Sequence, residues 1–449
     1  MYFIIAIFCL IISFLLFRKA SGSMSLQKLN LVSWIFYYEF FLQGWISAVL
    51  VVYSLDEHYM ISKVGSDLPR LYGYSSILYM LVAFPIGMML ANFVFRFSAK
   101  RKLDTFLNDP ITASFSRKDS YIRIPLYLLT LVSLCTVLYT FLVMRSIPIL
   151  QMFMGADSLL LSTMRIEVTK EFAGNVIIRN IFGLMLTPIL CYISYAYYRY
   201  SCTRKDFLWF LLMVILTVLI LTYNLEKAPL VFFLIGFMFL KVYIDGEIRR
   251  KTLIIIGSFC FILIVGLYSF LSESFSLQEL NNFRAGILGR VLLGQSTGLF
   301  MTFDTYPDVY DHIGFKSFSQ NFLNLFDLVE EDRSSRVLME RYNATGVELG
   351  VGGVMNSFFI AEAFANFGWP GLILSPIYVG FLIQCMYIFF VSSKKTPIVL
   401  GIFAYFSYKG GISGGFNEYI YNPVLFIITV VIIGAYFGAG YLKIIKKHY

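Results

Sequence analysis

The sequence predicts an all-α protein that crosses a membrane many times, and three observations lead to this fold class. The 449 residues are 58% hydrophobic and only 14% charged, with a mean hydropathy of +0.74. Many apolar runs reach the roughly 20 residues that an α-helix needs to cross a bilayer. Lys and Arg gather in the links between these runs. This composition excludes a soluble enzyme, a secreted disulfide scaffold and a disordered protein.

The first apolar run, 2–17, sets the expected orientation of the chain. No basic residue precedes it, and Arg18 and Lys19 follow it. A cleavable signal peptide has the opposite charge order, so we predict an uncleaved span with its N-terminus outside. The further predicted spans are 30–53, 71–95, 121–144, 176–198, 207–223, 229–244, 252–272, 371–392, 397–409 and 422–441. About eleven spans result, and the C-terminus then lies in the cytoplasm.

The basic residues agree with this topology. They are concentrated in the links expected on the cytoplasmic side, at 18–28, 96–118, 199–205, 249–251 and 394–395. An excess of Lys and Arg in cytoplasmic loops is the usual pattern of membrane proteins. The formal net charge of +9 therefore does not indicate a nucleic-acid partner.

Two external segments are long. The first covers 145–175, and the second covers 273–370 within what we expect to be a single membrane domain, 1–449. The second segment is amphipathic and rich in aromatic residues, which predicts helices lying over the membrane face. Its end, 354–368, is apolar, but counting it as a span would break the charge pattern.

We therefore predict a partly inserted outer helix over 354–368. The sequence Gly368-Trp-Pro-Gly371 is expected to stop this helix, because proline disfavours a helical residue before it. Glu362 lies within this apolar stretch.

The sequence lacks familiar catalytic motifs. It has no nucleotide-binding glycine loop, no zinc-binding HExxH and no recognisable Ser-His-Asp spacing. The six cysteines lie in or beside apolar runs, which suggests neither a disulfide framework nor a metal site. With only three histidines in the chain, any chemistry must depend mainly on carboxylates, arginines and lysines. We expect no metal and no cofactor.

Three external arginines are candidate ligands for phosphate. Arg284 and Arg290 are the only charged residues in an otherwise apolar or small run from 280 to 303. The planar guanidinium fork suits a phosphate group, although contact with ordinary lipid headgroups is the alternative. Arg165 likewise has no acid three or four residues away, and a solvated loop base is its alternative.

Two more residues complete the candidate site. Lys227 follows Glu226 in a short link between two spans, where it either pairs with that acid or faces an anionic ligand. Glu362 is the sharpest candidate for catalysis. Burial is expected to raise its pKa, which suits a general base near neutral pH. A structural role as the partner of an arginine is equally open.

Other charged residues have plainer interpretations. Arg333 and Arg336 lie among acids at helical spacing, which predicts a solvated helix face. Glu39, in the second span, is expected to be a hydrogen-bonded residue of the bundle. Lys409 and Glu418 flank a glycine-rich turn and are candidates for an ion pair.

In layout and in short stretches the chain resembles the bacterial O-antigen polymerase (Wzy-type) family, part of the wider set of repeat-unit polymerases and O-antigen ligases. Shared features are about eleven spans, one very large outer segment late in the chain and arginines in two outer segments. The matching stretches are the Arg165 segment, Glu226-Lys227-Ala-Pro229, Arg284/Arg290 to Gln295, and Asn356 to Gly371 with its embedded Glu362.

This resemblance implies a GT-C-like architecture and a metal-independent glycosyltransferase in the bacterial inner membrane. Donor and acceptor would be undecaprenyl-pyrophosphate-linked oligosaccharides, and the growing glycan would pass to the non-reducing end of a new repeat unit. The product would be O-antigen or a related surface polysaccharide. Arg165, Arg284, Arg290 and Lys227 would then bind the pyrophosphate or glycan, and Glu362 would be the base. A chain-length regulator and a flippase are the implied protein partners.

Two alternatives stay open. An O-antigen ligase of the same fold would depend on a histidine in the large outer segment, where only His312 is available. A flippase or exporter of lipid-linked oligosaccharides would place its cations around a central cavity within the spans.

Overall fold

The computed structural model describes residues 1–112, 120–271, 283–284, 286–318, 323–324, 326–348, 352–422, 425–434 and 437. Within these residues the secondary structure is helical, and no strand is present beyond one isolated antiparallel bridge between Phe358 and Ser413. The all-α fold class predicted from the sequence is confirmed for this part of the chain.

In the described part of the chain, nine helices are long and apolar enough to cross a membrane. They are α1 (Tyr2–Ser21), the run α2–η2–α3 (Leu31–Trp34, Ile35–Trp45, Ile46–Val52), α4 (Asp67–Val94), α6 (Ser120–Val143), the run α9–η4–α10 (Val176–Ile178, Arg179–Leu186, Thr187–Ser201), α11 (Arg204–Thr222), α12 (Lys227–Asp245), α20 (Phe359–Ser392) and the stretch Asn417–Gly434, which begins with α22 (Asn417–Ile420). The protein is therefore a polytopic membrane protein.

Two further predicted spans are also helical but are not among these nine helices. The predicted span 252–272 is α13 (Arg250–Leu271), whose end borders the undescribed residues 272–282. The predicted span 397–409 is α21 (Pro397–Lys409). With 13 residues, α21 is only about 20 Å long, less than the roughly 30 Å of a bilayer core.

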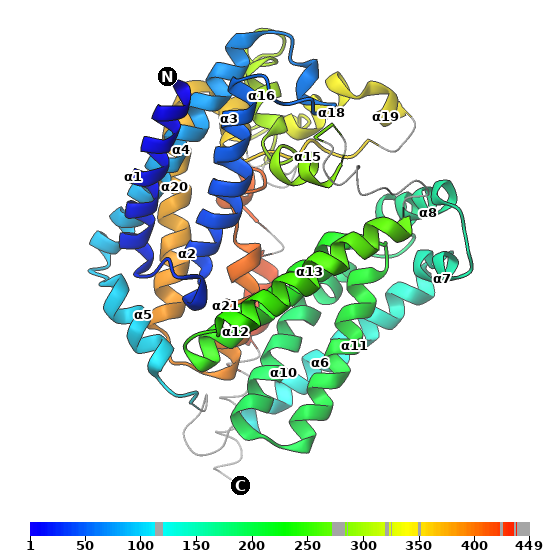
Figure 1. Cartoon of the computed structure of the whole chain (residues 1–449). Helices are drawn as coiled ribbons and strands as arrows, with labels where there is room; N and C mark the ends of the chain where they lie inside the picture. Colours follow the sequence, from blue (N-terminus) through cyan, green and yellow to red (C-terminus); the bar gives the residue numbers. More distant parts are fainter. Residues whose placement is uncertain are drawn as a thin grey trace.

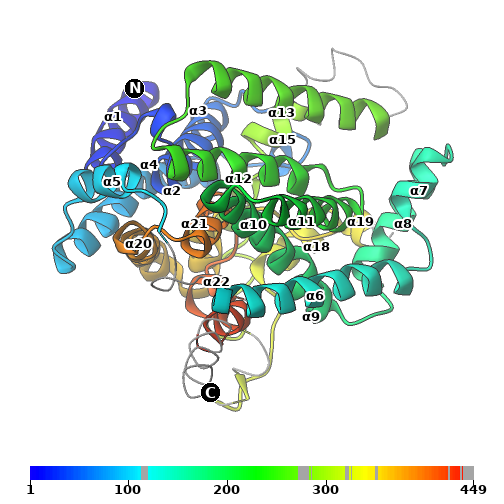
Figure 2. The same cartoon turned by 90° about the horizontal axis from the view of Figure 1, so that it is seen from below.

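The helices form two groups on either side of α21. One group contains α1, α2, α3, α4 and α20, and the other contains α6, α10, α11, α12 and α13 (Figures 1 and 2). Helix α21 packs against α10 and α12 on one side and against α2 on the other. It therefore contacts both groups, as α12 also does through the rings of Phe232 and Phe239 against Trp34.

The tightest crossing in the first group is that of α4 and α20. A Cβ atom on Gly87 would overlap the carbonyl of Ile377, and one on Gly380 would overlap the carbonyl of Phe84. Each helix thus contributes one glycine that lets the partner's backbone approach closely, which is a common way to pack helices in membranes.

Both π-helical segments carry a buried charged residue. Glu39 lies in η2 and Arg179 lies in η4, and each is only 4% exposed. π-Helical turns are rare and are frequent at functional sites, because they shift the direction of the side chains that follow. A charged side chain buried within a membrane span is costly. Such residues usually face the interior of the helix bundle and have polar partners there.

Short helices lie at one end of the bundle. Helices α15 (Ile287–Leu292), α16 (Thr297–Phe303), α18 (Ser334–Tyr342) and α19 (Ala344–Glu348) lie at the same end as the start of α1 (Figure 1). Helices α7 (Pro148–Phe153) and α8 (Ser158–Lys170) lie toward this end of the second group. The described parts of the two long segments predicted to share one side of the membrane thus lie at one end of the molecule, which we call the cap end.

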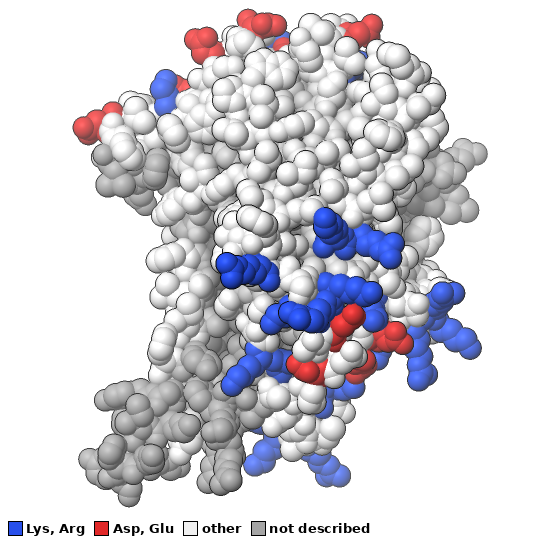
Figure 3. Space-filling view, turned by 90° about the vertical axis from the view of Figure 1, so that its left-hand side faces the viewer, with Lys and Arg blue, Asp and Glu red and all other residues white. Residues whose placement is uncertain are grey.

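Basic residues gather at the opposite end. The amphipathic helix α5 (Ala99–Asn108) buries Leu103 and Phe106 and exposes Lys100, Arg101 and Lys102. On the face shown in Figure 3, most Lys and Arg lie in the lower part, and a broad uncharged band separates them from the charged residues at the top. The density of basic residues therefore differs between the two ends of the helix bundle.

The segment predicted as a separate helix, 354–368, differs from expectation at its start and agrees with it at its end. The helix begins at Phe359, not at 354, because residues before it are extended and bonded to other segments. At Gly368 the backbone leaves helical geometry (φ 63°, ψ −148°), so the predicted stop of this helix is confirmed, and a second helix follows across the kink to Ser392. The bend frees the carbonyls of Ala365 and Asn366, which accept hydrogen bonds from the backbone of Ile313 and Gly314.

Candidate functional site

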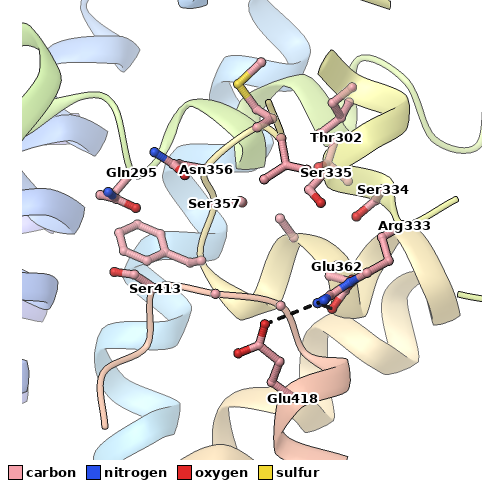
Figure 4. Close-up of a pocket in the computed structure, with 17 residues that line it drawn as sticks. Gln295, Thr302, Arg333, Ser334, Ser335, Asn356, Ser357, Glu362, Ser413 and Glu418 are labelled. Carbon is pink, nitrogen blue, oxygen red and sulfur yellow. Dashed lines mark hydrogen bonds and ion pairs between the residues drawn. The ribbon is translucent and has the colours of Figure 1, made fainter. Parts of the chain in front are cut away.

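A polar cavity of about 350 Å³ lies between the short helices of the cap end, the start of α20 and the glycine-rich loop 410–416. We call it the polar cavity. Hydroxyl, amide and charged side chains from these three segments converge on it (Figure 4). Its polar lining residues are Gln295, Thr302, Arg333, Ser334, Ser335, Asn356, Ser357, Glu362, Ser413 and Glu418.

The centre of this cavity is an ion pair between Arg333 and Glu362. The guanidinium donates from Nε to Oε1 of Glu362 at 2.6 Å and from Nη2 to Oε2 at 3.0 Å. Such a two-point contact fixes the direction of both side chains. The side chain of Glu362 is 5% exposed, whereas that of Arg333 is 38% exposed, so the arginine is the more accessible member of the pair.

Glu418 lies on the other side of the same arginine. Its Oε1 is 3.6 Å from Nη1 of Arg333, and its side chain is 52% exposed (Figure 4). Burial alone lowers the pKa of Arg333, but the hydrogen bonds and charge of Glu362, with those of Glu418, outweigh this and raise the pKa. Arg333 is therefore held as a cation between two carboxylates, one buried and one open to the cavity.

The glycine-rich loop covers the ion pair closely. A Cβ atom on Gly415 would overlap Nη2 of Arg333 and Oε2 of Glu362, so no larger residue fits there without displacing the pair. After the loop, the backbone N–H of Asn417 donates to Oε2 of Glu362 at 2.9 Å. The carboxylate of Glu362 thus accepts three hydrogen bonds, two from Arg333 and one from the main chain.

A ring of buried polar side chains holds Asn417 in place. Its Nδ2 donates to Ser317 Oγ at 3.0 Å, and its Oδ1 accepts from Nδ2 of Asn366 at 3.0 Å. The hydroxyl of Ser317 in turn donates to Oδ1 of Asn366 at 3.2 Å. This ring ties the cap end, the bend of α20 and α22 together directly behind the ion pair.

His312 lies at the bend and not in the cavity. Its Nδ1 is 3.3 Å from the carbonyl of Ala365, and its ring stacks on Tyr306. A Cβ atom on Gly368 would come within 2.9 Å of its Nε2. The contacts of this histidine are therefore with the bend of α20.

Arg284 and Arg290 lie outside the polar cavity. Both are exposed, and Arg290 belongs to α15. The carbonyl of Arg284 accepts the N–H of Tyr59, and the charge of Arg290 acts on the neighbouring His58. Gln295, five residues after Arg290, does line the cavity. These two arginines therefore lie near His58 and Tyr59 rather than in the polar cavity.

Arg165 lies near a second cavity, of about 320 Å³, in the other group of helices. Its Nε donates to the carbonyl of Asn224 at 3.0 Å. Asn224, Glu226 and Lys409 line this cavity. Lys227 starts α12 directly after Glu226, but its side chain lies outside the described residues. The predicted phosphate ligands are thus divided between two places.

Arg179 adds a third cation to this second region. Its Nη1 donates to the carbonyl of Val168 at 2.8 Å, and its guanidinium lies over the rings of Phe172 and Tyr223. Since Tyr223 also lines the second cavity, Arg179 lies close to this cavity.

Sequence reasoning found one residue of the ion pair and missed the other. The prediction of a solvated helix face is confirmed for Arg336, which pairs with Glu340 at 2.7 Å, but it is wrong for Arg333. A signal was present, because Arg336 has acids four residues away on both sides, whereas Arg333 has none. Glu418 was expected to pair with Lys409, but among the described residues its ion-pair partner is Arg333.

No metal-binding group is evident in the part of the chain that the structure describes, where no three His, Cys, Asp or Glu side chains come together. Comparisons of the chain with protein-family models, with curated proteins and with solved structures gave no match.

Proposed function

We propose that this protein is a membrane glycosyltransferase that polymerises lipid-linked oligosaccharide repeat units. In this proposal the growing glycan leaves undecaprenyl pyrophosphate and joins the non-reducing end of a new lipid-linked repeat unit, forming O-antigen or a related surface polysaccharide. The observation that carries the proposal is the polar cavity, in which an arginine and two carboxylates are surrounded by hydroxyl and amide side chains.

The lining of the cavity suits a sugar substrate. Asn, Gln, Ser and Thr side chains both donate and accept hydrogen bonds, as sugar hydroxyls do. The arginine suits the pyrophosphate leaving group, because Glu362 takes its Nε and one Nη2 hydrogen while the N–H groups on Nη1 are left to stabilise negative charge that develops on phosphate oxygens. Displacement at an anomeric carbon needs such a cation and a base beside the acceptor hydroxyl.

The contacts favour different roles for the two carboxylates. Glu362 accepts three hydrogen bonds and is almost fully buried, so few of its lone pairs are left for a substrate proton. Glu418 has one longer contact and faces the cavity. We therefore assign the base to Glu418 and propose that Glu362, the base expected from the sequence, serves catalysis by holding Arg333.

The other predicted phosphate ligands keep a proposed role outside the reaction centre. Arg284 and Arg290 near His58, Arg165 near the second cavity and Lys227 at the start of α12 would contact the pyrophosphates of the lipid carriers. Their separation from Arg333 fits a protein that must hold long amphipathic substrates at more than one point.

The proposed location is the bacterial inner membrane, with the cap end outside. The gathering of Lys and Arg at the opposite end supports this orientation, because basic residues favour the cytoplasmic side. The polar cavity would then open at the outer face, where lipid-linked repeat units are joined.

Deletion and complementation in the host test this function. Loss of the gene should leave surface glycan with a single repeat unit, and the wild-type gene should restore the ladder on a gel. Arg333→Ala and Arg333→Lys should both fail, because a lysine lacks the two-point geometry. Glu418→Gln should lower the rate about a hundredfold, the usual scale for loss of a general base.

Arg336→Ala is the matched control, since it removes a neighbouring surface ion pair of little energetic value. It should leave the ladder intact. A normal ladder with Arg333→Ala, in protein shown by immunoblot to be present at wild-type level, would remove the proposal for this site. Loss of single repeats on deletion would instead indicate export or ligation, and His312→Ala would then be the variant that separates a ligase from a flippase.

A further inference from the structure

Glu39 is a buried carboxylate in the middle of a membrane span. It lies in η2 and is 4% exposed. Within the described residues no Lys, Arg or His forms an ion pair with it. An acid in such a place costs several kcal/mol unless its oxygens are hydrogen-bonded, so its partners indicate what it does.

The partner of Glu39 is the glycine-rich loop. Its Oε2 accepts the backbone N–H of Ile412 in a short hydrogen bond. A Cβ atom on Gly411 would overlap the carboxylate of Glu39, so the loop approaches the acid as closely as a backbone can. The loop bonds in addition to the phenol of Tyr419, which donates to the carbonyl of Gly411.

The other side of the same loop holds the polar cavity. The N–H of Gly414 donates to the carbonyl of Ser357 at 3.1 Å, and the carbonyl of Ile412 accepts the N–H of Phe359 at 3.2 Å. Gly415 then lies against the Arg333–Glu362 pair. Two buried glutamates from different helices are thus bonded to the main chain on either side of one short glycine-rich segment.

We propose that Glu39 is a positioning residue that fixes the glycine-rich loop over the Arg333–Glu362 pair. It acts through backbone N–H groups and not through contact with a substrate. Loss of its carboxylate would release the Ile412 end of the loop, and the Gly415 end would then no longer confine the guanidinium of Arg333. The consequence for catalysis rests on the proposed function, whereas the effect on the loop does not.

Hydrogen–deuterium exchange of the purified full-length protein tests this inference without an activity assay. Glu39→Ala should speed exchange of the amides between 411 and 417 by about tenfold, the equivalent of one lost hydrogen bond of roughly 1.4 kcal/mol. Glu39→Gln keeps one acceptor oxygen and should therefore speed exchange less than Glu39→Ala.

Gln43→Ala is the matched control. Gln43 lies one turn further along η2 and is also buried, but no hydrogen bond joins it to the loop in the described residues. In the Gln43→Ala variant, exchange of the amides between 411 and 417 should be as slow as in the wild type. Unchanged exchange in Glu39→Ala, equal effects of Glu39→Ala and Gln43→Ala, or Glu39→Gln as fast as Glu39→Ala would overturn the inference.

The glycan ladder of complemented cells gives the second readout. Glu39→Ala should lower polymerisation and Glu39→Gln should restore part of it, with kcat falling and KM little changed once an assay with purified protein exists. If exchange responds as expected but the wild-type protein makes no polymer, the proposed function fails and the role of Glu39 in holding the loop stands. If the wild type polymerises and Glu39→Ala polymerises equally well, the positioning role fails.

Discussion

At the level of single residues, His58 has an unusual environment. It is 3% exposed, its Nδ1 has no hydrogen-bond partner among the described residues, and Arg290 lies nearby. Burial, and then the charge of Arg290, lower the pKa of His58 from its ordinary value of 6.5 to about 4. The folded protein therefore holds this histidine neutral over the whole physiological range.

This environment predicts an acid-sensitive stability. Between pH 6.5 and 4 the unfolded chain binds a proton at His58 that the folded protein does not, so stability must fall as the pH falls through this window. The free energy of unfolding should drop by about 2–3 kcal/mol, because one pKa unit corresponds to about 1.4 kcal/mol.

Thermal denaturation of the wild type and of His58→Gln at pH 7 and pH 4.5 measures this loss. The two proteins should differ little at pH 7, whereas at pH 4.5 the wild type should have lost more stability than the variant. Equal losses in both proteins would show that His58 does not carry the effect.

Glu362 and Arg333 show how far single residues could be predicted. An acid within an apolar run is visible in the sequence, because its burial is costly wherever it lies. Its partner is 29 residues away, and nothing local marks that pairing. The same limit applies to Glu418, which follows the glycine-rich loop after Lys409 in the sequence but lies beside Arg333 in space.

At the level of elements, the crossing of α4 and α20 depends on Gly87 and Gly380. A methyl group at either position would meet a backbone carbonyl, which cannot move aside as a side chain can. The two helices must separate to accommodate it, and the packing along their length then weakens.

Gly87→Ala and Gly380→Ala should each lower the free energy of unfolding by about 1–3 kcal/mol. The double variant should cost less than the sum of the two, because the first substitution already separates the helices at the same crossing. Thermal denaturation in one detergent measures this. The control is Gly257→Ala in α13, where nothing lies within 4 Å of the added atom, and it should be neutral or stabilising.

Helix bounds were predictable where the signal was local. The long apolar runs form helices close to their predicted ends, because length and hydropathy are enough to identify a membrane-spanning helix. The start of α20 was not predictable, since residues before Phe359 bond to distant segments. The N–H of Met355 donates to Ser335, and the carbonyl of Asn356 accepts from Gly298. These long-range bonds replace the local helical ones.

At the level of the whole molecule, the charge distribution predicts one orientation. Val329 at the cap end is 78% exposed, and Lys102 on α5 is exposed at the basic end. In a variant without native cysteines, Val329→Cys should react with a membrane-impermeant maleimide in intact spheroplasts. Lys102→Cys should react only after the membrane is disrupted. The reverse pattern would place the polar cavity on the cytoplasmic side.

The shortness of α21 has a consequence for how the protein is made. Thirteen residues followed by a polar glycine-rich loop are too few to partition into a bilayer as an independent segment. The surfaces that α21 occupies belong to α2, α10 and α12, all of which precede it in the chain. Biogenesis must therefore be ordered. The two helix groups are synthesised and inserted first, and α21 then enters the space between them, so that the polar cavity is completed only at the last stage of assembly.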